Sequence, residues 1–342
     1  MPNLNEHDII NMTSDYGKKI TLIIESAYKL KIEGYSPVEQ ISFTSKKALI
    51  STDRGVFFLK EKPFYSKGPQ ELFRSSTFQD YCARHSSSFV EIIKTKDKEC
   101  FFEFDGKTYF ITPYLEGGNF SGKHEELISM LDTLIELKGL GKKYLDENLA
   151  AYDLGMLAEN KSYDVILPFL LLDPMIRTKE DQTTFSRLKE VLDILRTEFD
   201  SQDGVEYGMC HGDCILFNFQ VLPDRTILHD FDNAKVLPAI HDIAEFFVSS
   251  CLLNYAGSIT NLKLPIFLNT HEAIAKQMAH RISQHLTEKE KRLLPICIEI
   301  IWIWTLMLSV IKEDYKMTDL APAIENIFQR KLHCHLIVMF SN

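Results

Sequence analysis

Several features are scarce in this 342-residue sequence, and each shortage excludes a class of protein. The seven cysteines are odd in number and follow no regular spacing, which suits a reducing cytoplasm better than a disulfide framework. No Cys-x-x-Cys pair accompanies Cys210, His211 and Cys214, so we expect no zinc site there. The first seven residues are polar and contain no apolar core, so we expect no export signal.

Positive charge is also scarce. The sequence has 38 Lys and Arg against 48 Asp and Glu, so its formal net charge is -10. Nucleic acids require clustered cationic side chains, so we expect no nucleic-acid partner. The acidic balance is compatible with a cationic substrate, although solubility alone also explains it. The chain is long enough to form two lobes with a sizeable core.

Only one apolar run, residues 293–311, approaches the length of a membrane span. Glu299 lies inside this run, and an acidic group at the centre of a bilayer costs about 3 kcal/mol. We therefore expect a buried helix with Pro295 in its N-terminal turn and Glu299 facing a polar partner, and no membrane insertion.

A dense group of polar residues lies between positions 207 and 242. His211, Gly212 and Asp213 are followed, after four residues, by Asn218. In phosphoryl-transfer catalytic loops, an Asp at this spacing accepts the proton of a hydroxyl and the Asn oxygen holds magnesium. Asp and Asn often merely mark turns, and a single pair would favour that simpler interpretation.

A second acidic cluster follows one short hairpin later and favours the catalytic interpretation. Residues 227–228 are apolar and predict a strand that delivers Asp230 to the same place. Magnesium prefers hard oxygen ligands, so Asn218 and Asp230 are suitable ligand types. Asp232 comes two residues later, and Asp242 opens a predicted helix.

These motifs resemble those of the aminoglycoside phosphotransferase and choline kinase superfamily, the small-molecule relatives of protein kinases. The short strand-rich N-terminus looks most like the spore-coat kinase-like branch. The resemblance implies that Asp213 is the catalytic base, that Asn218 and Asp230 are metal ligands, and that Asp242 braces the catalytic loop. His211 belongs to the same loop motif, and Asp232 fills a second acidic position whose role is less uniform.

In the N-terminal part, a helix is predicted over residues 6–33, followed by strands over 38–43, 48–52 and 55–60. The resemblance implies that Lys60, at the end of the third strand, pairs with the α- and β-phosphates of ATP. Residues 42–47 contain no glycine, which departs from the glycine-rich loop of protein kinases. Which backbone N–H groups contact the phosphates is therefore left open.

Residues 69–85 predict the next helix, in which the family has a Glu that pairs with the strand lysine. That Glu would fall near Ser75 or Ser76, where this sequence has no carboxylate. Glu71, one turn earlier, is the best substitute, although an acid in a first helical turn is also favoured by the helix dipole alone. Two strands are then predicted over 89–94 and 100–104, and a third over 107–112.

Residues 112–118 resemble the family's hinge, although a simple linker between lobes is the competing interpretation. The edge of adenine needs a backbone acceptor and a backbone donor two residues apart. The carbonyl of Pro113 and the N–H of Leu115 would provide them, and a proline loses nothing there by lacking an N–H.

The remainder of the sequence predicts mostly helices, over 124–139, 142–158, 181–199, 241–254, 266–286 and 288–316. We expect an α+β, two-lobed protein-kinase-like fold with a small antiparallel-sheet N-lobe and a mostly helical C-lobe. Residues 1–112 would form the nucleotide-binding lobe, 113–118 the hinge and 119–342 the lobe that carries the catalytic loop and acceptor site. By location alone, the acceptor contacts would come from Asp153, Asp173, Glu245 and residues 254–264.

The resemblance implies an ATP- and Mg²⁺-dependent phosphotransferase that acts on a hydroxyl of a small molecule. Protein kinase activity is disfavoured, because no Ala-Pro-Glu element follows Asp230 and only about eleven residues separate it from His241. A pseudokinase, acting as a nucleotide-binding scaffold or a spore-structure component, is the alternative. The missing glycines and the displaced Glu favour it, whereas the presence of Lys60, Asp213, Asn218 and Asp230 together disfavours it.

Overall fold

A computed structural model describes residues 14–36, 47–61, 69–149, 172, 176–252, 264–311 and 316–341. The chain divides into two compact units, which are described separately. The first unit comprises Met1–Gly118 and Gln220–Ala234, and the second comprises Asn119–Phe219 and Lys235–Asn342. Residues of the Gln220–Ala234 segment thus pack with the N-terminal part, although they follow the catalytic-loop motif in the sequence.

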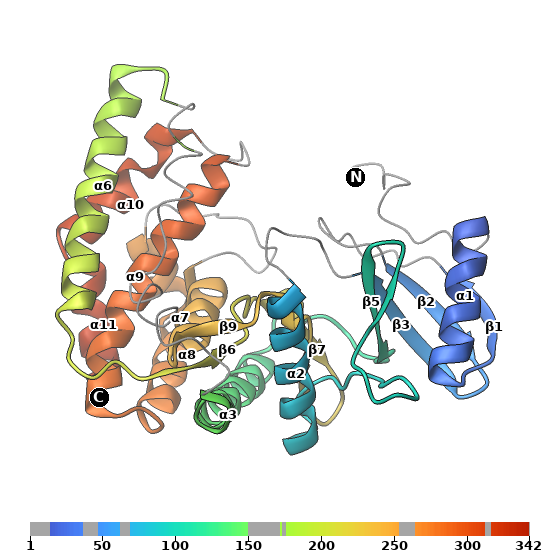
Figure 1. Ribbon diagram of the computed structural model, residues 1–342. Helices are drawn as coiled ribbons and strands as arrows, with labels where there is room; N and C mark the ends of the chain where they lie inside the picture. Colours follow the sequence, from blue (N-terminus) through green and yellow to red (C-terminus); the bar gives the residue numbers. More distant parts are fainter. Residues whose placement is uncertain are drawn as a thin grey trace. The chain divides into compact units, whose positions relative to one another are not determined.

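The first unit is built on a five-stranded antiparallel sheet with the strand order β1-β2-β3-β5-β4 (Figure 1). The strands are β1 (Ile32–Ser36), β2 (Lys47–Thr52), β3 (Gly55–Glu61), β4 (Phe102–Phe104) and β5 (Lys107–Pro113). The predictions of strands at 48–52, 55–60 and 107–112 are confirmed, and the strand expected at 100–104 begins two residues later. The strand predicted over 38–43 lies outside the described residues.

Helix α1 (Asp15–Tyr28) covers one face of this sheet, where Ile20 and Ile24 join a core with residues of β2, β3 and β5. Its first turn is capped by Ser14, whose side chain accepts the N–H of Gly17. The prediction that this helix extends to residue 33 is wrong. Lys29 adopts the left-handed conformation (φ 53°) that ends helices, and Ile32 instead pairs with Thr52 in the sheet.

Helix α2 (Pro69–His85) is confirmed, but the segment after it is irregular rather than a strand over 89–94. That segment makes isolated bridges at Phe89 and Ile93. The first of these holds β8 (Thr226–Leu228), because Leu228 donates to the Ser88 oxygen (2.9 Å) and accepts from the Val90 N–H (3.1 Å). Strand β8 pairs with β7 (Phe219–Val221), as the predicted hairpin requires.

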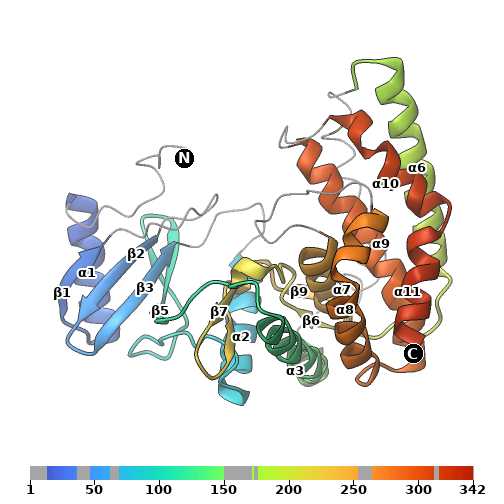
Figure 2. The same ribbon diagram turned by 180° about the vertical axis from the view of Figure 1, so that it is seen from behind.

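The second unit is mainly helical. Its elements are α3 (His124–Asn148), α6 (Lys179–Asp200), β6 (Tyr207–Cys210), β9 (Lys235–Pro238), α7 (His241–Phe247), a π-helix (Val248–Leu252), α8 (Leu264–Ser283), α9 (Glu288–Ile311), α10 (Ala321–Phe328) and α11 (Lys331–Ser341). Helices α6, α9, α10 and α11 pack against one another in both views (Figures 1 and 2).

Helix α3 is continuous, so the prediction of separate helices over 124–139 and 142–158 is wrong. Gly141, which lies between these two ranges, serves packing. Gly141 is buried against β6, and a Cβ atom at this position would lie 2.0 Å from the backbone oxygen of Met209. The missing side chain therefore lets α3 approach the strand that leads into the catalytic-loop motif.

Helix α9 contains the long apolar run, and the side chain of Glu299 is fully buried within it. Glu299 contacts Arg330 (3.1 Å) and His333 (3.1 Å), which supply the polar partners that the sequence predicts. Pro295 lies two turns inside the helix, so its placement in the N-terminal turn is wrong. Among the described residues, no helix is long and apolar enough to cross a membrane.

Candidate active site

The face of the sheet that points away from α1 carries two lysines. Alternation along β2 and β3 places Lys47 and Leu49 on the same face as Phe58 and Lys60, because Lys47 pairs with Lys60 and Leu49 with Phe58. We call this surface the lysine face. Phe110 of β5, opposite Lys60, completes it, and its ring centroid lies 5.9 Å from the Lys60 Nζ.

Lys60 contacts two carboxylates of the first unit. Its Nζ forms an ion pair with Asp230 and another, at 2.6 Å, with Asp232. Burial alone would lower the pKa of Lys60, but the two acids outweigh it and raise the pKa above its usual value. Burial likewise opposes the charge of Asp230, yet Lys60 and Lys47 hold the pKa of this carboxyl well below its usual range.

The backbone around Asp230 is held in an uncommon conformation. Asp230 follows β8 with φ 68° and ψ 54°, in the left-handed region, and a 3₁₀ helix (Phe231–Asn233) begins directly after it. The fully buried Phe231 fixes this turn, since its ring packs against Phe78 of α2 (5.8 Å) and Phe89 (6.3 Å). A strained turn anchored by a core aromatic aims the Asp230 carboxylate at Lys60.

Helix α2 presents neutral polar residues at the positions where the sequence analysis expects the family's glutamate. Ser75, Ser76 and Gln79 are buried, each with 1% of its surface exposed. Asp80, the acid of α2 within the described side chains, pairs with Arg84 and Lys94 instead. Glu71 lies in the first turn of α2, and its side chain lies outside the described part, so its pairing with Lys60 stays a prediction.

The pairing at the end of β5 fixes the direction of the Pro113 carbonyl. The Tyr114 N–H donates to the Val56 oxygen (3.0 Å), and Pro113 lies opposite Phe57. Antiparallel strands alternate between hydrogen-bonded and non-bonded pairs, so the Pro113 carbonyl points away from β3. On that same edge, the oxygen of Ile111 accepts the N–H of Ile93 (2.9 Å). Leu115 follows in the loop and is half-buried.

In the second unit, β6 leads into His211, Gly212 and Asp213. Gly212 has φ +75°, which a residue with a side chain rarely adopts, so this turn explains the glycine of the motif. The Asn218 amide nitrogen donates to the backbone oxygen (2.7 Å) and to Oδ2 (3.0 Å) of Asp213. A carboxylate only accepts hydrogen bonds, so the NH₂ of Asn218 faces Asp213 and its Oδ1 points elsewhere.

The carboxylate of Asp242, in the first turn of α7, holds the backbone of this loop. One oxygen accepts the His211 N–H (2.7 Å) and the other accepts the Gly212 N–H (2.9 Å). Burial raises the pKa of Asp242, although the loop N–H groups favour its charged form. These two hydrogen bonds fix the peptide planes on either side of His211.

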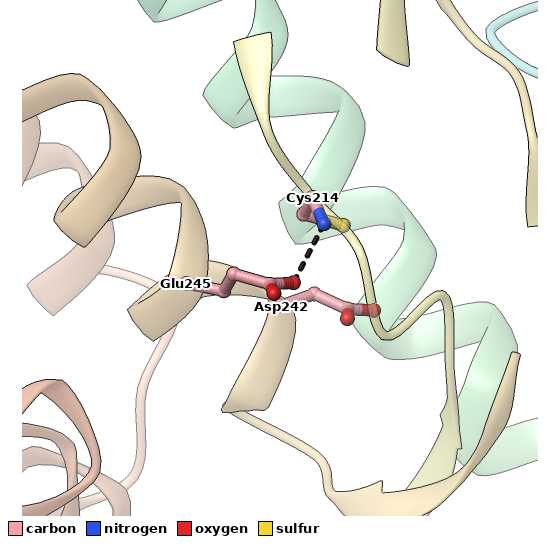
Figure 3. Close-up of side chains that lie close together, drawn as sticks. All are labelled: Cys214, Asp242 and Glu245. Carbon is pink, nitrogen blue, oxygen red and sulfur yellow. Dashed lines mark hydrogen bonds between the residues drawn. The ribbon is translucent and has the colours of Figure 1, made fainter. Parts of the chain in front are cut away.

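Glu245, one turn further along α7, holds the other side of Asp213. Its Oε2 accepts the Cys214 N–H at 2.6 Å (Figure 3). Burial, followed by the nearby charge of Asp213, raises the pKa of Glu245 to about 8. Asp213 thus lies between two residues whose backbone N–H groups are bound by acids of one helix.

Cys214, Asp242 and Glu245 have ligand-type atoms within 4.8 Å of one another, but their chemistry disfavours a metal site (Figure 3). Three of the four carboxylate oxygens already accept backbone N–H groups. Burial raises the pKa of the Cys214 thiol well above its usual value, whereas a metal requires the thiolate. The cluster is better explained by its hydrogen bonds to the loop, which hold the backbone around Asp213 in place.

The structure thus brings the predicted site residues together as two sets, one in each unit. The first set is Lys60, Asp230 and Asp232, and the second is His211, Asp213, Asn218 and Asp242. Of the acceptor candidates, Asp153, Asp173 and residues 254–263 lie outside the described residues. Glu245, which the sequence singled out as an acceptor contact, binds the loop backbone instead.

Lys47, which lies opposite Lys60 on the lysine face, was not among the residues singled out from the sequence. The two-residue turn at Asp53 and Arg54 pairs Thr52 with Gly55, and counting outward from that turn places Lys47 opposite Lys60. The signal was therefore present in the hairpin register.

Comparisons with known proteins identify the fold. No protein-family model matches the sequence, and no curated protein matches it. Among solved structures, an amicoumacin kinase in complex with AMP-PNP and Ca²⁺ has a TM-score of 0.62 at 10% identity, over 94% of this chain and 93% of that one. A microcompartment-associated aminopropanol kinase has a TM-score of 0.58 at 11% identity, over 94% and 99% of the two chains.

A spectinomycin phosphotransferase, in complex with ADP and spectinomycin, has a TM-score of 0.53 at 11% identity, over 90% and 98% of the two chains. At such identities the likeness is one of fold, and it confirms the predicted α+β class. The chain has the protein-kinase-like fold shared by the aminoglycoside phosphotransferases and related small-molecule kinases.

Proposed function

We propose that this protein is an ATP- and Mg²⁺-dependent phosphotransferase that phosphorylates a hydroxyl group of a small molecule. The observation that carries the proposal is the ion pair between Lys60 and Asp230, two residues separated by 170 positions. Kinases of this fold need a strand lysine and a metal-binding Asp at the phosphates. The amicoumacin kinase and spectinomycin phosphotransferase structures, which hold AMP-PNP and ADP, support a nucleotide as phosphoryl donor.

In the first unit, the residues have roles in nucleotide binding. Lys60 contacts the phosphates, and Pro113 and Leu115 offer a carbonyl and an N–H to the adenine edge. Asp230 is a hard oxygen ligand in a turn that fixes its direction, and Asn218 of the second unit offers an amide oxygen, so both suit magnesium. When bound, magnesium would neutralise charge on the phosphates. Asp232 keeps Lys60 paired when Asp230 serves as a ligand.

In the second unit, Asp213 positions the acceptor hydroxyl and takes its proton. Asn218 orients the Asp213 carboxylate through the 3.0 Å hydrogen bond, while Asp242 and Glu245 fix the backbone on either side of it. A base held by three neighbours loses little entropy when the hydroxyl arrives, which is how such loops contribute to rate.

We also propose a role for each part of the chain. Residues 1–112 bind the nucleotide together with Asp230, residues 113–118 form the hinge, and the remainder of 119–342 carries the catalytic loop and the acceptor contacts. The far end of the hinge pairs with β7, because Gly118 and Val221 exchange two backbone hydrogen bonds (2.9 and 2.8 Å). Gly117 must lack a side chain there, since a Cβ atom would lie 2.7 Å from the Val221 oxygen.

A nucleotide-binding scaffold without turnover is the second candidate. The buried neutral face of α2, with Ser75 and Ser76 in place of an acid, favours it. An enzyme would show Mg²⁺-dependent stabilisation by ATP in a thermal-shift assay and ATP consumption in a screen of small alcohols, amino alcohols and aminoglycosides. Stabilisation by nucleotide without consumption across such a screen would support the scaffold, and neither effect would contradict both.

A further inference from the structure

The phosphates of a nucleotide need cationic or N–H partners, and the sequence before β2 lacks the glycines that usually expose backbone N–H groups. The lysine face offers a replacement at the first residue of β2. Lys47 lies directly opposite Lys60, and directly opposite residues of antiparallel strands have Cβ atoms about 5 Å apart on one face. The Lys47 Nζ lies over the ring of Phe58, 5.7 Å from its centroid.

Like charges directly opposite each other destabilise a sheet, so Lys47 and Lys60 are an unfavourable pair unless other charges compensate them. Asp230 and Asp232 balance the two cations, but within the described part of the chain both acids make their ion pairs with Lys60 and Lys47 makes none. Burial and then Lys60 lower the pKa of Lys47, while the two acids raise it by less. An anion bound beside Lys47 would relieve its repulsion with Lys60.

We propose that Lys47 is a second phosphate-binding cation, which works beside Lys60 and replaces the backbone donors of the missing glycine-rich loop. This inference rests on the proposed nucleotide binding. When Asp230 serves as a metal ligand, two ammonium groups face one remaining carboxylate, Asp232, and the local charge becomes positive. An anion at the lysine face then contacts Lys47 and Lys60 together.

The test compares nucleotides that differ only in phosphate. Calorimetric titrations of the wild type, Lys47→Gln and Lys47→Arg with ADP and with adenosine, at fixed Mg²⁺, separate phosphate contacts from base contacts. We expect Lys47→Gln to weaken ADP binding by about tenfold or more, the scale of one charged hydrogen bond, and to leave adenosine binding unchanged. Lys47→Arg should retain most of the ADP affinity, because it keeps the charge.

Lys107→Gln is the matched control. Lys107 belongs to the same sheet but lies on its α1 side, where it pairs with Glu61 (3.2 Å) and lies over the ring of Tyr16. Its loss should leave ADP affinity unchanged. Lys47→Gln should also raise the unfolding temperature without nucleotide, because it removes the repulsion with Lys60, while it reduces the additional stabilisation by ADP.

Two results would overturn the inference while leaving the proposed function intact. One is ADP binding by Lys47→Gln that equals that of the wild type. The other is an equal loss of ADP and adenosine affinity, which would place Lys47 at the base or in the fold. If the wild type itself bound neither ligand, the proposed function would fail and this inference with it.

Discussion

The side chain of Asn218 makes two hydrogen bonds to Asp213, one to its backbone oxygen at 2.7 Å and one to its carboxylate at 3.0 Å. Five positions separate the two residues, and a short 3₁₀ helix (Leu216–Asn218) turns the chain back between them. The amide of Asn218 therefore sets the direction of the Asp213 carboxylate before any ligand binds.

Asp213→Asn and Asp230→Asn should have different kinetic signatures. Asp213→Asn should lower kcat by roughly two or more orders of magnitude, the scale of a lost general base, and leave Mg-ATP affinity near that of the wild type. Asp230→Asn should abolish the Mg²⁺-dependent part of nucleotide binding as well as turnover. Calorimetric titration of Mg-ATP, together with rates on any accepted alcohol, measures both effects. Loss of nucleotide affinity in Asp213→Asn would contradict the assigned roles.

Two glycines of α3 should respond in opposite directions to replacement by alanine. In Gly141→Ala, the new Cβ would meet the Met209 backbone oxygen at 2.0 Å, so α3 and β6 must separate. We expect the free energy of unfolding to fall by about 2 kcal/mol or more, as for other overpacked cores. Gly139→Ala meets no atom within 4 Å and should instead raise it by about 0.5–1 kcal/mol through helix propensity. Urea unfolding curves of the two variants provide the comparison.

The buried carboxyl of Glu245 should make stability depend on pH. Its pKa is about 8 in the folded protein against an ordinary value of 4.5, so the folded state keeps a proton that the unfolded state loses. This group therefore reduces the free energy of unfolding as pH rises from about 4.5 to about 8. Glu245→Gln retains an acceptor for the Cys214 N–H and should be more stable than the wild type at pH 8, with the difference shrinking towards pH 5.

Denaturant unfolding at several pH values, with the wild type and Glu245→Gln in parallel, tests this dependence. Glu147→Gln, which removes an exposed charge on α3, controls for the change in net charge. Parallel curves for wild type and Glu245→Gln across the whole range would show that Glu245 stays ionised in the folded protein.

The ion pairs of Arg330 should contribute far more to the free energy of unfolding than an exposed ion pair does. Arg330 lies between Glu299 of α9 (3.1 Å) and Glu198 of α6 (2.7 Å), and Glu299 is fully buried. Arg330→Ala leaves that carboxylate with His333 alone, so we expect a loss of about 3 kcal/mol in the free energy of unfolding. Arg281→Ala breaks a half-exposed pair with Asp132 and should cost no more than about 1 kcal/mol. Equal losses would mean that Arg330 does not offset the burial of Glu299.

Local patterns in the sequence predicted several features of this fold. The order of His211, Asp213, Asn218 and Asp230 along the chain predicted the catalytic-loop motif. The turn at Asp53 and Arg54 specifies the register of β2 and β3, because a two-residue hairpin leaves one pairing. Period-2 alternation predicted both strands, and the apolar pair before Asp230 predicted β8. These features depend on neighbours within a few residues, which sequence patterns report directly.

Contacts between residues far apart in the sequence could not be predicted from local patterns. Lys60 and Asp230 are 170 positions apart, and no local pattern states that both Asp230 and Asp232 would contact one ammonium group. Gly141 lies within a continuous helix, although two separate helices were predicted around it. The close approach of β6 explains why this position has no side chain. Helix α7 places Glu245 where it accepts the Cys214 N–H, and an unbonded polar group in this buried place would cost free energy. Such contacts depend on how helices and strands pack together, and local sequence patterns do not report that packing.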